Sequence, residues 1–171
     1  MPFGSPQSAK IKIARFLGVP VGEAAPEFAA TTIAGRPLKS QDLQGKVVLL
    51  DFWATWCAPC VAEIPNIKRL REKFSANGRF EVVGFSLDDH EASVAEFVRQ
   101  QGLSWPQIML GPDESNSIRM LYNVGSIPAT FLIDADGRVV ANDLRGSALE
   151  AKVSELLSQS PKRPKAGNRG R

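Results

Sequence analysis

The two cysteines of this 171-residue chain lie three positions apart, in the segment Trp56-Cys57-Ala58-Pro59-Cys60. Thiols at this spacing can close a disulfide within one helical turn and open it again. At a helix N-terminus, free backbone N–H groups and a partial positive charge favour the thiolate. The pKa of such a thiol falls from about 8.5 to roughly 3.5–7.5. The spacing therefore predicts thiol-disulfide exchange, with Cys57 attacking a disulfide and Cys60 resolving the mixed disulfide.

Two other uses of the cysteine pair compete with redox chemistry. A structural zinc site needs four ligands, and the chain adds only the distant His90 to its two cysteines. A static disulfide across so short a loop would restrict the unfolded chain little. The sequence therefore favours a reactive pair, and neither a metal nor another cofactor is expected. His90 is predicted to be a surface residue at the start of a helix.

Two carboxylates precede and follow the cysteine pair. Asp51 interrupts the apolar run 46–53, six residues before Cys57. Burying a carboxylate is costly and raises its pKa. Asp51 is thus either a hydrogen-bonded or sheet-edge aspartate, or a proton acceptor for Cys60. Glu63 lies one turn after Cys60, where by itself it would be a solvent-facing helix residue.

A strand before the cysteines and a helix after them are needed to position these groups. The nearly continuous apolar run 46–53 predicts a central strand that is buried on both faces. Apolar residues from Val61 to Phe74 recur at helical spacing, so a helix is expected to begin at the cysteine segment. Pro59 suits the first turn of that helix, because its missing N–H costs little there.

The other predicted strands surround this central unit. Residues 28–43 predict a hairpin that turns at 34–36, and residues 80–87 predict a second buried strand. Residues 129–134 and 138–142 predict a closing hairpin at an antiparallel edge. Because strands and helices alternate in the first part of the chain, those strands should pair in parallel.

Three further helices are expected. Asp88 or Asp89 is predicted to cap a helix after the second strand. A short helix is predicted from about residue 113 to 122. Ser147 and Glu150 are predicted to form a capping box at the start of the last helix.

The charge of the chain is uneven. Residues 160–171 hold five cations and no acid, and subtracting these five from the net +3 leaves −2 for the rest. We expect 1–25 to be a leader or linker, 26–159 to be one domain, and 160–171 to be a basic disordered tail. Solvation of that tail is favoured over contact with nucleic acid or a membrane surface. No run of about 20 apolar residues predicts a membrane span.

Two segments carry a family resemblance. The segment DFWATWCAPC at 51–60 resembles the active-site segment of the thioredoxin superfamily, and IPATF at 127–131 resembles its cis-proline loop. Their spacing, with PEF at 26–28 and CVAEIP at 60–65, is similar to TlpA/ResA-type thiol-disulfide oxidoreductases. The resemblance covers roughly residues 24–158. It implies an α/β thioredoxin-like fold, with a central mixed sheet flanked by helices, an N-terminal β-hairpin extension and a central helical insertion.

The resemblance also implies roles for the cysteines and the carboxylates. Cys57 would be the exposed nucleophile and Cys60 the buried resolving thiol. Glu63 matches an active-site glutamate of the TlpA/ResA group. Asp51 stands where that group often has Asn and where thioredoxins have a buried Asp, so both carboxylates would serve Cys60.

A substrate-binding surface follows from the same resemblance. An Ile127–Pro128 bond is predicted to be trans from the sequence alone, whereas the resemblance implies cis, with Pro128 packed against the cysteines. The Ile127 backbone would pair with an extended substrate. Trp56, Ala58 and Pro59 would form the rest of the surface.

The predicted function is that of a thiol-disulfide oxidoreductase that reduces protein disulfides. The alternatives are a non-catalytic binding or assembly module and, less favoured, a thiol peroxidase or a disulfide oxidase. Leu50 and Ala54 stand where peroxiredoxins have their Pro and Thr, which disfavours the peroxidase.

The expected partners are disulfide-containing proteins and an upstream thiol reductant, with the chain itself a monomer. By resemblance the chain is periplasmic or otherwise extracytoplasmic, and the cytoplasm is the alternative because the chain shows neither signal nor anchor. Cytochrome c biogenesis is one role within the resembling group.

Overall fold

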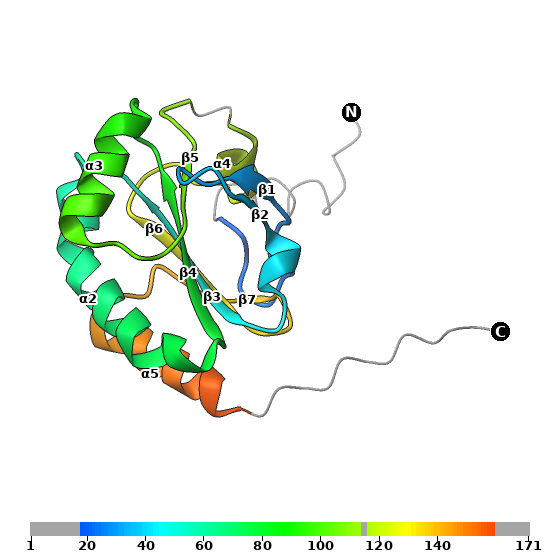
Figure 1. Ribbon diagram of the computed structural model, residues 1–171. Coiled ribbons are helices and arrows are strands. Elements are labelled where there is room, and N and C mark those ends of the chain that lie inside the picture. The colour runs from blue at the N-terminus through cyan, green and yellow to red at the C-terminus, as the bar shows by residue number, and fades with distance from the viewer. Residues whose placement is uncertain (1–17, 114–115, 160–171) are drawn as a thin grey trace, which may run out of the picture.

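A five-stranded mixed sheet forms the centre of the computed structural model, which describes residues 18–113 and 116–159 (Figure 1). Its strands in chain order are β3 (Val47–Trp53), β4 (Phe80–Ser86), β5 (Gln107–Met109), β6 (Ala129–Ile133) and β7 (Val139–Asn142). Across the sheet the order is β5-β4-β3-β6-β7. β3 pairs in parallel with β4 and antiparallel with β6, so the strand before the cysteines is central, as predicted.

The predicted N-terminal hairpin is present as a separate two-stranded sheet. It consists of β1 (Ala29–Thr31) and β2 (Pro37–Lys39), which pair antiparallel. Gly35 has a φ of +76° in the turn between them, a conformation that glycine adopts without steric cost. The other elements are η1 (Ser40–Leu43), α2 (Ala58–Phe74), η2 (Ser75–Asn77), α3 (Glu91–Gln101), α4 (Ser117–Leu121) and α5 (Gly146–Ser158).

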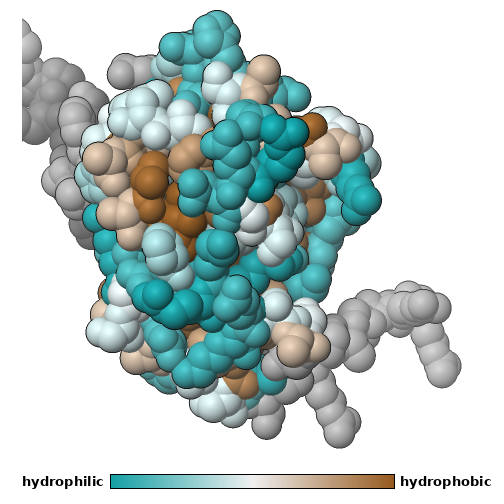
Figure 2. Space-filling model, turned by 60° about the vertical axis from the view of Figure 1, so that its left-hand side comes forward, coloured by the Kyte–Doolittle hydropathy of each residue, from teal (hydrophilic) through white to brown (hydrophobic). Residues whose placement is uncertain are grey.

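β3 separates two hydrophobic clusters, because successive side chains of a strand point to opposite faces of the sheet. Val48, Leu50 and Phe52 belong to the cluster beneath the hairpin and α4. Val47, Leu49 and Trp53 belong to the cluster beneath α2, α3 and α5. These three helices lie together on one side of the sheet in Figure 1, and the hairpin and α4 lie on the other. Figure 2 brings the helical side forward, where hydrophilic residues predominate around a smaller hydrophobic group.

An edge strand, β5, was not predicted from the sequence. Its three residues pair in parallel with β4 at Gly84, Phe85 and Ser86. Three residues are too few for alternating hydrophobicity to show a strand. The insertion between β4 and β6 therefore contains α3, β5 and α4 rather than helices alone.

Both predicted side-chain caps are wrong. The N-cap residue of α3 is His90, which is exposed and makes no side-chain cap, and neither Asp88 nor Asp89 caps this helix. α5 begins at Gly146, before the predicted capping box, and its N-cap residue Arg145 makes no side-chain cap. At the start of α5, the backbone N–H of Gly146 is bonded by a carboxylate of α2, that of Glu63. Before α3, the Asp88 carboxylate bonds Thr55 and does not cap the helix.

Residues 18–25 pack against the sheet, although the sequence places them in the leader. The N–H of Gly22 donates to the carbonyl oxygen of Val139, 2.7 Å away, so this segment runs beside β7. The rest of the predicted leader, 1–17, and the predicted basic tail, 160–171, lie outside the described residues. Within the described ranges, no helix is long and apolar enough to cross a membrane.

Candidate active site

The two cysteines form a disulfide at the N-terminus of α2. Cys57 is the N-cap residue with an extended backbone, and Pro59 lies in the first helical turn, as predicted. Cys57 is 6% exposed and Cys60 is 3% exposed. Cys57 is therefore buried, and not exposed as the resemblance implies. It is still the more accessible of the two.

The residues predicted to meet substrate lie at the surface around this disulfide. Trp56 is 66% exposed. Ala58 and Pro59 are exposed, whereas Ile127 and Pro128 are half-buried. The Ile127–Pro128 peptide bond is cis, as the resemblance implies and contrary to the expectation from the sequence alone.

Strand pairing brings the Pro128 loop to the cysteine end of β3. β6 begins at Ala129, directly after Pro128, and Ala129 lies opposite Phe52, near the end of β3 that leads to Cys57. The Arg145 Nη2 atom lies 3.5 Å from the Pro128 carbonyl oxygen. Arg145 was not predicted as a site residue, because it is distant in sequence from both the loop and the cysteines.

Asp51 lies on the helix side of the sheet, in the middle of the central strand. By alternation its side chain faces the same way as Leu49 and Trp53, which share a hydrophobic cluster with Cys57 and Cys60. Asp51 is 6% exposed, and within the described ranges its carboxyl makes no hydrogen bond. The sheet-edge alternative is therefore wrong, because β3 is the central strand, and the role of Asp51 as proton acceptor for Cys60 stays a prediction.

The pKa of Asp51 is raised from 3.8 to about 7. Burial is the largest cause, because it penalises the charged form. The negative charge of Glu63 raises this pKa further, and the positive charge of Arg145 lowers it. A carboxyl group with a pKa near 7 exists in both protonation states at neutral pH, which is what a proton acceptor needs.

Glu63 joins the cysteine helix to α5. Its Oε1 atom accepts a hydrogen bond from the N–H of Gly146 at 2.8 Å, and its Oε2 atom accepts one from Asn66 Nδ2 at 2.9 Å. A carboxylate at a helix N-terminus is stabilised by the free N–H groups and the helix dipole. Glu63 is half-buried, so the solvent-facing alternative is wrong. Glu63 thus lies one helical turn after Cys60 in α2 and contacts the start of α5.

Asp88 is a second residue that sequence reasoning placed elsewhere. It is 4% exposed, and its carboxylate accepts hydrogen bonds from Thr55, two residues before Cys57. One signal for this contact is available in the sequence. Asp88 follows the strand that pairs in parallel with β3, and the carboxyl ends of parallel neighbours meet at one edge of the sheet.

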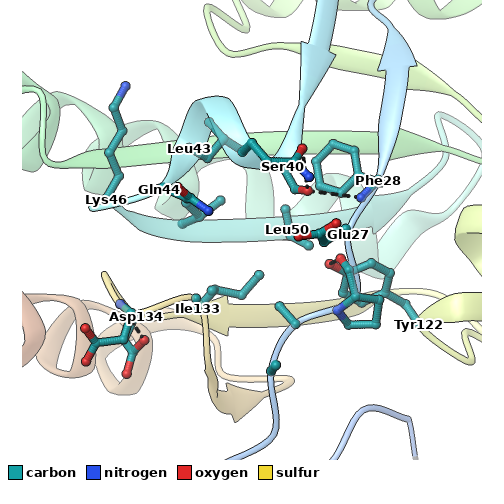
Figure 3. A pocket seen from close by; sticks show the side chains of 17 residues that line it. Glu27, Phe28, Ser40, Leu43, Gln44, Lys46, Leu50, Tyr122, Ile133 and Asp134 are labelled. Atoms are coloured by element: carbon teal, nitrogen blue, oxygen red, sulfur yellow. Dashed lines mark hydrogen bonds between the residues drawn. The ribbon is translucent and has the colours of Figure 1, made fainter. Parts of the chain in front are cut away.

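A separate cavity of about 210 Å³ lies on the opposite face of the sheet, beneath the hairpin (Figure 3). Leu50 and Phe28 line its apolar part, and Glu27 and Asp134 line its polar part. None of the predicted site residues lines it. The described residues contain no group of three or more His, Cys, Asp or Glu side chains that could hold a metal.

Comparisons with known proteins show a family match over most of the chain. The profile of the AhpC/TSA family matches residues 21–142. A thiol-disulfide oxidoreductase ResA of Bacillus anthracis is 39% identical over 120 residues, which are 70% of this chain and 67% of the relative. A ResA of Bacillus cereus (strain ATCC 10987) is 33% identical over 139 residues, 81% of this chain and 78% of the relative.

Solved structures show the same fold. The thioredoxin domain of a thiol-disulfide oxidoreductase from Bacteroides vulgatus has a TM-score of 0.73 and 28% identity, and covers 80% of this chain and 97% of its own. A putative thiol:disulfide interchange protein DsbE from Chlorobium tepidum has a TM-score of 0.68 and 30% identity, and covers 81% of this chain and 95% of its own. The predicted thioredoxin-like fold is confirmed.

Proposed function

We propose that this chain reduces disulfide bonds in other proteins. The chain belongs to the AhpC/TSA family of thioredoxin-fold proteins and, within it, to the ResA-like thiol-disulfide oxidoreductases. The family establishes the oxidoreductase activity, and the direction, the substrates and the roles of the residues are the proposal. The observation that carries it is the Cys57–Cys60 disulfide at the start of α2, with the buried Asp51 carboxyl on the strand behind it.

The first step is the attack of the Cys57 thiolate on a substrate disulfide. A bond forms between Cys57 Sγ and one substrate sulfur, the substrate S–S bond breaks, and the departing sulfur takes a proton from solvent. An extended substrate chain would pair with the Ile127 backbone beside the cis-Pro128 bond. The exposed ring of Trp56 offers apolar surface to the same chain.

The second step releases the reduced substrate. The Cys60 thiol gives its proton to the Asp51 carboxylate, and the Cys60 thiolate attacks Cys57 Sγ. The mixed disulfide breaks, the second substrate sulfur leaves as a thiolate that takes a proton from solvent, Asp51 returns its proton to solvent, and the Cys57–Cys60 disulfide forms again. The Asp51 pKa of about 7 supports this role, because the ionised form can accept a proton near neutral pH. An upstream thiol reductant then restores both thiols.

The partners and the compartment are part of the proposal. Substrate disulfides persist in oxidising compartments such as the bacterial periplasm and are rare in the cytosol. We therefore expect an extracytoplasmic site of action and disulfide-containing proteins as substrates. Reduction of a cytochrome c precursor is one such reaction.

The redox potential tests the reductive direction. Ala58 and Pro59 are small and neutral, so they add no positive charge that would stabilise the reduced form. We expect a potential near the thioredoxin value of about −270 mV, rather than near the value of about −120 mV of a strong oxidant. Equilibration with dithiothreitol and glutathione buffers measures it. A potential on the oxidising side of the midpoint of that range would contradict the proposed reductase.

Trapping of substrates separates a redox enzyme from a binding module. In Cys60→Ser the first step proceeds and the second cannot, so Cys57 should retain substrates as mixed disulfides. The expected result is a set of larger species on non-reducing gels that dithiothreitol releases. The Cys57→Ser/Cys60→Ser double variant is the control and should retain none. Equal recovery of proteins by both variants would favour the non-catalytic binding module.

A further inference from the structure

We propose that Asp88 is a positioning residue for the attacking thiol, because its buried carboxylate fixes the turn that leads into Cys57. The inference rests on the proposed role of Cys57 as the nucleophile. Nothing in the exchange chemistry requires Asp88 to touch the substrate or the sulfur atoms. Its proposed effect passes through Thr55 and the backbone.

Three hydrogen bonds converge on the Asp88 carboxylate. Its Oδ2 atom accepts one from the N–H of Thr55 at 3.0 Å and one from Ser86 Oγ at 2.7 Å. Its Oδ1 atom accepts one from Thr55 Oγ1 at 2.5 Å. Ser86 Oγ in turn accepts a hydrogen bond from the Asp88 N–H at 3.1 Å. A buried carboxylate is tolerated when it is satisfied in this way, and hydrogen bonds to a charged acceptor are among the strong ones.

The sheet brings these residues together. The parallel ladder of β3 and β4 ends with Trp53 opposite Ser86, and the Leu87 N–H extends it by donating to the Trp53 carbonyl oxygen at 2.9 Å. Continuing that register places Thr55 opposite Asp88. The carboxylate thus bonds the chain at the point where β3 has ended and α2 has not begun.

Ala54 and Cys57, at the two ends of this turn, are buried in the hydrophobic cluster, whereas few other contacts hold the residues between them. Within the turn, the Cys57 N–H donates to the Ala54 carbonyl oxygen at 3.1 Å. Trp56 is 66% exposed, so most of its side chain packs against nothing that would restrain the backbone. Thr55 is bonded through both its backbone and its side chain, and it is separated from Cys57 by one residue. A loss of the Asp88 contacts would therefore free the segment that sets the orientation of the thiol.

The orientation matters because stabilisation of a thiolate by a helix N-terminus falls off within the first turn. Breaking the contacts should therefore raise the pKa of the Cys57 thiol. Removing the Asp88 charge, taken alone, should lower that pKa, because a nearby negative charge disfavours the thiolate. The two effects have opposite signs. The other charged groups around the site, Asp51, Glu63 and Arg145, stay unchanged in the variants.

Two variants break the contacts in different ways. Thr55→Val keeps the size and the charge but removes the hydroxyl donor. Asp88→Asn keeps the size, removes the charge and replaces one acceptor oxygen by a donor. Thr55→Ser keeps the hydroxyl and serves as the conservative rescue. Asp89→Asn removes a neighbouring exposed charge and is the matched control.

The test is the rate of iodoacetamide labelling of the reduced full chain from pH 5 to pH 9, with peptide mapping to assign the label to Cys57. Below its labelling midpoint, Thr55→Val should be labelled about tenfold more slowly than the wild type, which corresponds to a one-unit rise in the midpoint. Asp88→Asn should also be slower than the wild type but less so than Thr55→Val, because loss of its negative charge lowers the Cys57 pKa. Thr55→Ser and Asp89→Asn should match the wild type. The Thr55→Val/Asp88→Asn double variant should be labelled no more slowly than the slower single variant, because both substitutions act through one contact.

Several results would overturn the inference. Faster labelling of Asp88→Asn would show that only its charge matters, and an unchanged rate in Thr55→Val would show that the contact does not position the thiol. Thermal unfolding of each oxidised variant, measured in parallel, identifies any variant that fails to fold. If Asp88→Asn fails to fold, the labelling rate of Thr55→Val decides whether the contact positions the thiol. If Cys57 of the wild type reacts like an ordinary thiol, the proposed function fails. If it is reactive but the variants are unaltered, only the role of Asp88 fails.

Discussion

Turnover of a disulfide substrate is expected to fall by roughly a thousandfold or more in Cys57→Ser, because the variant has no thiolate to form the mixed disulfide. A serine hydroxyl stays protonated at neutral pH, and the helix N-terminus cannot ionise it. Cys60 is 3% exposed and cannot replace Cys57 without a movement of the helix start. The measurement is single-turnover reduction of oxidised glutathione by the reduced protein.

Cys60→Ser is the matched control for this prediction. It should form the mixed disulfide at close to the wild-type rate and then stop, because the attacking thiol is intact and the resolving thiol is absent. The two serine variants therefore fail at different steps. If Cys57→Ser formed the mixed disulfide at the wild-type rate while Cys60→Ser did not, the assignment of attacking and resolving thiols would be reversed.

Asp51→Asn is expected to stabilise the oxidised protein at pH 8 by up to about 4 kcal/mol relative to the wild type. The folded protein raises the pKa of Asp51 from 3.8 to about 7, so the folded state binds this proton more tightly than the unfolded state. Stability from Asp51 is thus fully present below pH 4 and is lost as the pH rises through 7. A shift of about three units corresponds to on the order of 4 kcal/mol.

Urea unfolding of the oxidised wild type and of Asp51→Asn at pH 4, 6 and 8 measures this effect. The difference in unfolding free energy should grow with pH, because asparagine does not titrate and the other groups are common to both proteins. Asp89→Asn, which changes an exposed carboxylate, should show no such trend. A difference that stays constant from pH 4 to pH 8 would contradict a raised pKa for Asp51.

Asp51→Asn should also slow the attack of Cys60 on the mixed disulfide, because Cys60 loses its proposed proton acceptor. General-base catalysis contributes typically a factor of 10²–10⁴, so the mixed disulfide of Asp51→Asn should accumulate during turnover, while its formation on Cys57 remains fast. Quenching the reaction with acid and separating the species by mass measures both rates. Unchanged resolution would assign Asp51 a structural part only.

Much of the site could be predicted because it is local in the chain. The apolar run 46–53 indicates a buried strand, the spacing from Val61 to Phe74 indicates a helix, and the cysteines lie between them. All of this depends on the periodicity of side chains within one segment. The predicted burial of Asp51 followed from its neighbours in the run. The two predicted caps failed for a related reason, since a capping pattern shows that a side chain can cap a helix and does not show that other partners are absent.

By itself the sequence determined the chemistry of this protein, the Cys57–Cys60 pair at the junction of a buried strand and a helix. The tertiary structure alone decided which distant groups surround it. Parallel pairing of β4 with β3 brings Asp88 to Thr55, and the return of the chain through β6 to α5 brings Gly146 to Glu63. These contacts join residues up to 83 positions apart. They arise from strand register and helix packing, which depend on the burial of whole elements and leave no pattern within one segment.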